Sequence, residues 1–252
     1  METGLWVFAI AANLVAVLRL YQLSLHVGYR YFFCFLIAQA FQSLLLFSVP
    51  VGSAAYFWAY FITAPVLWLS YFLVVREIYA LIFNAYKGIY TVTRWSMYAA
   101  WVLAIVVSTL SIVVTHSAAA GESHLKYVLT MERGVVFSLV LFLPLALYFL
   151  SHYPIALHRN AVVHSILYST FFLADAGMHA INATASAGVS HLANLALMAI
   201  TGICFGAWSV LLTRKGEVRE VNAIRRHNPA NDARLLAQLN AMNETLLHLI
   251  RK

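Results

Sequence analysis

Charged side chains are scarce in this sequence, and acidic ones are the scarcest. Only 10% of the 252 residues are charged and only nine are acidic, whereas 63% are hydrophobic. A water-soluble domain of this length needs a charged surface that this composition cannot supply. The scarcity excludes a soluble globular protein and indicates an integral membrane protein.

Cysteine is also rare. Cys34 and Cys204 are the only two, and both lie in apolar runs. Two such residues cannot form the disulfide framework of a small secreted domain. The opening stretch METGLWVFAI lacks a basic region and a small-residue cleavage site, so we interpret it as the start of the first span rather than a removable signal peptide.

Long apolar runs fill most of the chain. A helix needs about 20 residues to cross a hydrocarbon layer of roughly 30 Å. Seven segments meet this length and are separated by polar stretches such as NAYKGIYTVTR. They are Gly4–Leu25, Tyr31–Val49, Ala55–Val75, Trp95–Thr115, Leu125–Leu150, Val162–Ala185 and His191–Leu212. The sequence predicts an all-α polytopic bundle of seven transmembrane helices over residues 1–214, with kinks at Pro65 and Pro144.

Basic residues predict the orientation of the bundle. With the N-terminus outside, fourteen of the sixteen Lys and Arg residues fall on the cytoplasmic side, and only Lys126 and Arg133 fall on the other. This bias predicts an N-out/C-in topology. The net charge of +7 then suits anionic lipid headgroups, so the lipid bilayer is the expected partner and nucleic acid need not be invoked.

The basic cytoplasmic tail, residues 215–252, contains one helical pattern. Asn228 and Pro229 resemble a helix start, and an amphipathic helix is predicted over about 229–250. Five residues mark one face at three- and four-residue spacing: Leu236, Leu239, Asn243, Leu246 and Ile250. Such a face, with Asn at a core position, fits self-association into a homo-oligomer or a larger membrane complex. The alternative is a helix that packs under the bundle or lies on the membrane surface.

The stretch FFLADAGMHA, residues 171–180, places two ionisable side chains inside the sixth span. Asp175 and His179 are one helical turn apart and share a face. Ionisable groups at this depth usually face the bundle interior and have a partner. Glu132 and Arg133 in the fifth span lie at a similar depth, so Arg133 is the predicted counter-ion of Asp175, and Glu132 is available to His179.

The same residues raise a second interpretation, a ligand pocket or a metal site. His179 with His116, His124 and His191 offers ligand types for zinc or iron, but their spacing matches no metal motif. Retinal is disfavoured because the seventh span lacks the lysine that a Schiff base needs. Haem is disfavoured because the two histidines within spans, His164 and His179, lie on one helix. No cofactor is predicted.

Several short stretches, RYFF, ERG, YPIALHRN and LLAQLN, give the chain a resemblance to uncharacterised bacterial seven-transmembrane-helix membrane proteins. The resemblance implies the topology and a bacterial cytoplasmic (inner) membrane, and it assigns no site. With no catalytic domain attached, we expect a sensor, receptor-like or assembly protein with output through the tail. The alternative is a membrane-embedded enzyme or cofactor-binding subunit that uses Asp175, His179, Glu132 and Arg133, so enzymatic activity stays open.

Overall fold

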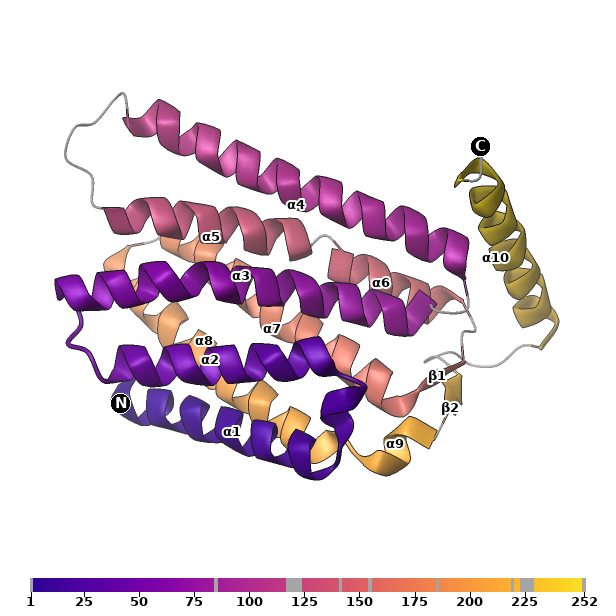
Figure 1. The fold of residues 1–252 in the computed structure, drawn as a ribbon, viewed down its shortest axis with the longest axis horizontal. Helices are drawn as coiled ribbons and strands as arrows, with labels where there is room; N and C mark the ends of the chain where they lie inside the picture. Colours follow the sequence, from indigo (N-terminus) through magenta and orange to yellow (C-terminus); the bar gives the residue numbers. More distant parts are fainter. Residues whose placement is uncertain are drawn as a thin grey trace.

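The computed structural model describes residues 2–83, 86–116, 124–140, 142–153, 156–184, 186–218, 220–222 and 229–250. In these residues the chain is all-α apart from one short strand pair. It contains seven helical segments that are long and apolar enough to cross a membrane. Figure 1 shows the spanning helices lying roughly side by side, with a separate helix, α10, at one end. The predicted fold class and the predicted tail helix are confirmed.

The first four spans are single helices. They are α1 (Glu2–Gln22), α2 (Arg30–Phe47), α3 (Ala54–Phe83) and α4 (Lys87–His116), and a 3-10 turn, η1 (Leu25–Val27), joins α1 to α2. Two predicted spans were shorter than the helices that contain them. Helix α3 continues past Val75 to Phe83, and α4 begins at Lys87 rather than Trp95. Helices can extend beyond the hydrocarbon layer, so hydropathy alone underestimates their length.

The remaining spans are α5 (His124–Val140) with α6 (Phe142–His152), then α7 (Arg159–Thr184) and α8 (Ala187–Leu211). The predicted fifth span corresponds to α5 and α6 together, and Leu141 between them is outside the described residues. Pro144 lies in the first turn of α6. The Tyr79 hydroxyl of α3 donates a hydrogen bond to the Phe142 carbonyl at the start of α6.

The tail forms α9 (Arg214–Val218), β2 (Glu220–Asn222) and α10 (Pro229–Ile250). Strand β2 pairs antiparallel with β1 (Ala156–His158), which precedes α7. This strand pair, which the sequence analysis did not predict, ties the tail to the α6–α7 connection. We call the end of the bundle that carries α9 and α10 the C-terminal end, and the opposite end, where α1 begins, the N-terminal end (Figure 1).

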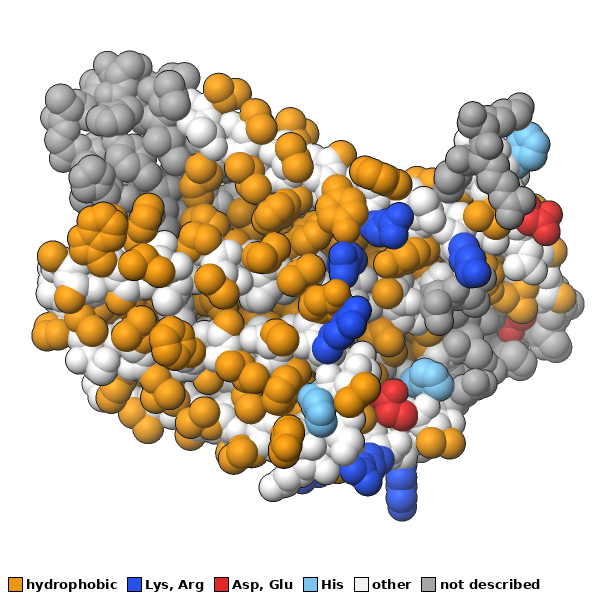
Figure 2. All heavy atoms as spheres, in the orientation of Figure 1, with side chains coloured by type: hydrophobic (Ala, Val, Ile, Leu, Met, Phe, Trp, Pro, Cys, Tyr) orange, Lys and Arg blue, Asp and Glu red, His pale blue; other side chains and the backbone are white. Residues whose placement is uncertain are grey.

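Aromatic side chains build much of the core. Phe32, Phe35, Tyr168, Phe172 and Trp208 are fully buried where α2, α7 and α8 meet. Large apolar side chains are exposed on the outward faces of the helices, as expected of surfaces that contact lipid. Figure 2 shows these apolar side chains over most of one face, while the basic side chains gather toward the C-terminal end.

Two glycines of α8, Gly202 and Gly206, are four residues apart, a spacing that lets helix backbones approach closely. A Cβ at Gly202 would overlap the Phe8 ring of α1, whereas a Cβ at Gly206 would meet nothing within 4 Å. Gly202 thus allows the close approach of α1 and α8.

Candidate functional site

The predicted polar residues gather in the half of the bundle toward its N-terminal end. Tyr60 of α3, Glu132 of α5, and Asp175 and His179 of α7 form a group that we call the carboxyl cluster. Asp175 and His179 are 8% and 9% exposed. The Tyr60 hydroxyl donates a short hydrogen bond to Glu132 Oε2. Asp175 and Glu132, from different helices, are close enough to interact electrostatically.

The pairing inside this cluster differs from the predicted one. Among the described residues, no ion pair joins Arg133 to Asp175, and the Arg133 side chain is exposed. Asp175 Oδ1 instead lies 3.8 Å from His179 Nε2, beyond hydrogen-bond distance. Consecutive helical residues point about 100° apart. Arg133, the residue after Glu132, is exposed and forms no ion pair with Asp175, although it is close enough to His179 to interact with it electrostatically.

The other predicted ligands are not brought together. Within the described part of the chain, no group of three His, Cys, Asp or Glu side chains could hold a metal ion. The side chains of His116 and His124 lie outside the described residues. His191 is the fifth residue of α8 and belongs to no such group among the described residues. The carboxyl cluster therefore consists of two acidic side chains, one histidine and one tyrosine.

His164 is a buried histidine that the sequence analysis considered only as a haem ligand. It is fully buried, and its ring contacts Phe32, Tyr29, Tyr168 and Trp208 at centroid distances of 4.4–6.0 Å. Neither ring nitrogen has a hydrogen-bond partner in the described structure. Its position within a span was visible in the sequence, but much of the aromatic enclosure comes from two other parts of the chain, the start of α2 and the end of α8.

Acidic side chains at the C-terminal end are held differently. Glu77 of α3 accepts hydrogen bonds from the backbone N–H groups of Tyr31 at 3.1 Å and Phe32 at 3.0 Å. These amides belong to the first turn of α2 and have no partner within that helix. A carboxylate from a neighbouring helix thus caps α2.

Glu217 of α9 is held by side-chain donors. Its Oε1 accepts hydrogen bonds from the Tyr29 hydroxyl at 2.7 Å and from Asn160 Nδ2 at 2.6 Å. Asn160 also bonds the backbone carbonyl and amide of Thr213 at 2.7 and 3.2 Å. Burial, followed by the Glu217 carboxylate, raises the pKa of Tyr29 above its ordinary value. This network joins the α1–α2 connection, the start of α7 and α9.

The tail helix is docked on the bundle. Asn243 Oδ1 of α10 accepts a 2.8 Å hydrogen bond from the backbone N–H of Gly88, in the first turn of α4. Leu239 is fully buried, and Leu246 packs against the core. Of the predicted association residues, Leu236 is half-buried and the Ile250 side chain lies outside the described residues. The structure therefore shows the bundle-packing alternative, while self-association stays a prediction.

Comparison of the chain with protein-family models, with curated proteins and with solved structures gives no match. The seven spans that the resemblance implied are present in the structure.

Proposed function

We propose that this chain is a membrane sensor or receptor-like protein whose input site is the carboxyl cluster and whose output element is α10. The observation that carries the proposal is the docking of α10 on α4 through Asn243 and Gly88. Helix α4 packs along α5, and α5 presents Glu132 to Asp175. One set of packed helices thus connects the buried acids with the tail.

The input site has the properties that a switch requires. Asp175 and Glu132 are ionisable groups inside a spanning bundle, where such groups are rare and usually functional. A bound cation, a protonation change or a polar ligand between them would alter the packing of α5 against α7. Since α4 contacts both α5 and α10, such a change can bias whether α10 stays docked.

The proposal includes an orientation. The basic side chains of the described loops and helix ends gather at the C-terminal end, which we assign to the cytoplasm (Figure 2). The N-terminus then lies outside, and the cluster sits in the outer half of the bundle. Placement in a bacterial inner membrane follows from the sequence resemblance. A reporter fused after Lys252 is expected to report a cytoplasmic location.

Spin-label distances between α10 and α4 test the coupling. Cysteines introduced at the exposed residues Asn240 and Ser96 carry the labels, with Cys34 replaced by serine. Glu132→Gln and Asp175→Asn are expected to shift or broaden the measured distance distribution. Two further variants calibrate it: Asn243→Ala, expected to release α10, and Glu244→Gln on the exposed side of α10, expected to leave the distance unchanged.

An unchanged distribution in both carboxyl variants, with a clear change in Asn243→Ala, would refute coupling between the cluster and the tail. Metal analysis and optical spectra of the same purified protein address the competing class. Stoichiometric zinc, iron or haem would favour an enzyme or cofactor-binding subunit over a sensor.

A further inference from the structure

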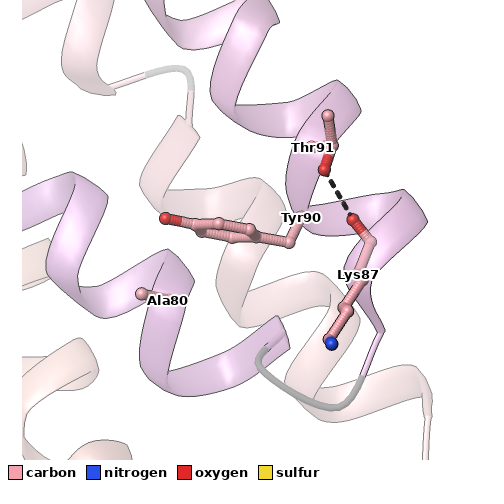
Figure 3. A pocket seen from close by; sticks show the side chains of 4 residues that line it. All are labelled: Ala80, Lys87, Tyr90 and Thr91. Carbon is pink, nitrogen blue, oxygen red and sulfur yellow. Dashed lines mark hydrogen bonds between the residues drawn. The ribbon is translucent and has the colours of Figure 1, made fainter. Parts of the chain in front are cut away.

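A cavity of about 330 Å³ opens between α3 and α4 at the C-terminal end of the bundle. It is lined by Ala80 of α3 and by Lys87, Tyr90 and Thr91 of α4. Figure 3 shows the Tyr90 ring reaching from α4 toward Ala80, with Lys87 one turn earlier on the same helix. The Thr91 hydroxyl donates to the Lys87 carbonyl at 2.8 Å, which leaves its oxygen able to accept further bonds.

One basic side chain lines this cavity, and two more lie near its Tyr90 side chain. Lys87 lines it, and the Arg94 guanidinium lies 5.7 Å from the centroid of the Tyr90 ring. Arg76 of α3 interacts electrostatically with Tyr90, and its guanidinium donates to Tyr31 and Tyr98 at 2.7 and 3.2 Å. Of these three cations, Lys87 therefore lines the cavity, while Arg94 and Arg76 lie close enough to interact with its Tyr90 side chain.

These cations lack acidic partners in the described part of the chain. No described carboxylate lies within ion-pair distance of Arg76, Lys87 or Arg94. Glu77, the acid adjacent to Arg76, is occupied by two backbone amides of α2. The Nε atom of Arg94 is buried without a hydrogen-bond partner. The cavity thus has a positive charge that nothing described in the chain neutralises.

The cavity lies where the basic end of the bundle meets its lipid-facing surface. Val92 and Trp95, one turn or less along α4 from the cavity residues, expose large apolar side chains, as do Val102 and Leu103 further along the helix. A phospholipid has the same division, with a charged phosphate at the interface and acyl chains alongside the helices. Basic pockets between transmembrane helices suit anionic headgroups.

We propose that the cavity between α3 and α4 binds the phosphate of an anionic phospholipid, with Lys87, Arg94 and Arg76 as its cationic ligands. The lipid's acyl chains then run along the exposed apolar face of α4. This site is argued independently of the sensor function, because it uses no residue of the carboxyl cluster and requires no movement of α10.

Native mass spectrometry of the full chain in detergent tests the site with phosphatidylglycerol and phosphatidylcholine added at equal concentrations. Phosphatidylglycerol is expected to be retained preferentially. The double variant Lys87→Gln/Arg94→Gln should bind it about 25-fold more weakly, since each basic residue near an anionic lipid contributes roughly a fivefold factor. The charge-matched control Arg19→Gln/Lys215→Gln removes two exposed cations away from the cavity and should retain binding.

A second variant keeps the charges and fills the space. Ala80→Phe is expected to reduce phosphatidylglycerol retention while preserving all three cations, and it gives a result even where the double variant does not fold. Equal retention of the two lipids, or undiminished binding in Ala80→Phe, would overturn the proposal. Displacement of the lipid by millimolar inorganic phosphate would also overturn it, because the site would then be one for a soluble anion.

Discussion

Carboxyl groups at the two ends of the bundle differ in the hydrogen-bond donors that hold them. At the C-terminal end, Glu77 accepts from two backbone amides, and Glu217 accepts from a phenol and a side-chain amide. In the carboxyl cluster, Glu132 accepts from the Tyr60 phenol and interacts with the Trp68 indole, and Asp175 lies 3.8 Å from a histidine nitrogen. A carboxylate held by several donors fixes the structure around it, whereas one with few donors stays available for a ligand or a proton.

The largest expected effect comes from removing the cap at the C-terminal end. Glu77→Ala leaves two amides of α2 without an acceptor, one of them buried. An unsatisfied buried donor costs about 1–3 kcal/mol, so we expect a loss of about 4 kcal/mol in the free energy of unfolding. Denaturation with SDS in mixed micelles measures it. Glu77→Gln keeps one acceptor and should recover about half of the loss, whereas a loss below about 1 kcal/mol in Glu77→Ala would contradict the cap.

Removing the phenol from the Glu217 network is expected to cost less. Tyr29→Phe deletes a hydrogen bond to a carboxylate, worth about 1.5–3 kcal/mol. The pKa of Tyr29 is raised above its ordinary 10.0, so the folded state retains the phenolic proton after the unfolded chain has lost it. This contribution is fully present below pH 10 and declines above it.

Unfolding free energies of wild type and Tyr29→Phe, measured below and above pH 10, test whether the contribution of Tyr29 declines as the pH rises. Their difference should be constant below about pH 10 and shrink at higher pH. A difference that grows with pH would show that the phenol does not donate to Glu217.

A smaller loss is expected from crowding the same network. A Cβ at Gly216 would overlap Asn160 Oδ1, so Gly216→Ala should displace the Asn160 side chain and cost about 2 kcal/mol. Gly206→Ala is the matched control, since its Cβ meets nothing within 4 Å. Equal thermal stability of both variants in detergent would show that the network tolerates displacement.

The smallest stability effects are expected in the carboxyl cluster. Asp175→Ala and Arg133→Ala break no described hydrogen bond, so each should cost less than about 1 kcal/mol, and their effects should add within about 0.5 kcal/mol. Thermal melts of the two single variants and the double variant in detergent measure the sum. Strong non-additivity would restore the ion pair that the sequence predicted and erase the contrast between the two ends.

The spans were predictable because hydropathy over 20 residues is a local property, and the tail helix because Leu239, Asn243 and Leu246 repeat on one face. The strand pair β1–β2 was not, since three residues carry no readable periodicity. Glu77 gave no signal either, because the backbone amides that donate to it lie 45 and 46 residues away in sequence.

For the carboxyl cluster, the sequence predicted the depth of the residues in the bundle but not the direction in which their side chains point. Counting residues along each span placed Asp175, His179, Glu132 and Arg133 at similar depth, and the structure does bring Glu132 to Asp175. Depth does not give rotation about the helix axis, and rotation decides which of two consecutive residues faces inward. The functional roles of Arg133 and Glu132 depend on this rotation, and they stay predictions.

The close contact of α1 with α8 has a consequence for how the protein is made. Gly202 of α8 lies against Phe8 of α1, yet about 165 residues separate the end of α1 from the start of α8. At roughly 5–20 residues per second of synthesis, α1 waits roughly 10–30 s before its partner exists. During that interval its apolar contact face can be shielded only by lipid, by the helices synthesised between α1 and α8 or by the insertion machinery, and the bundle closes only when the last span is made.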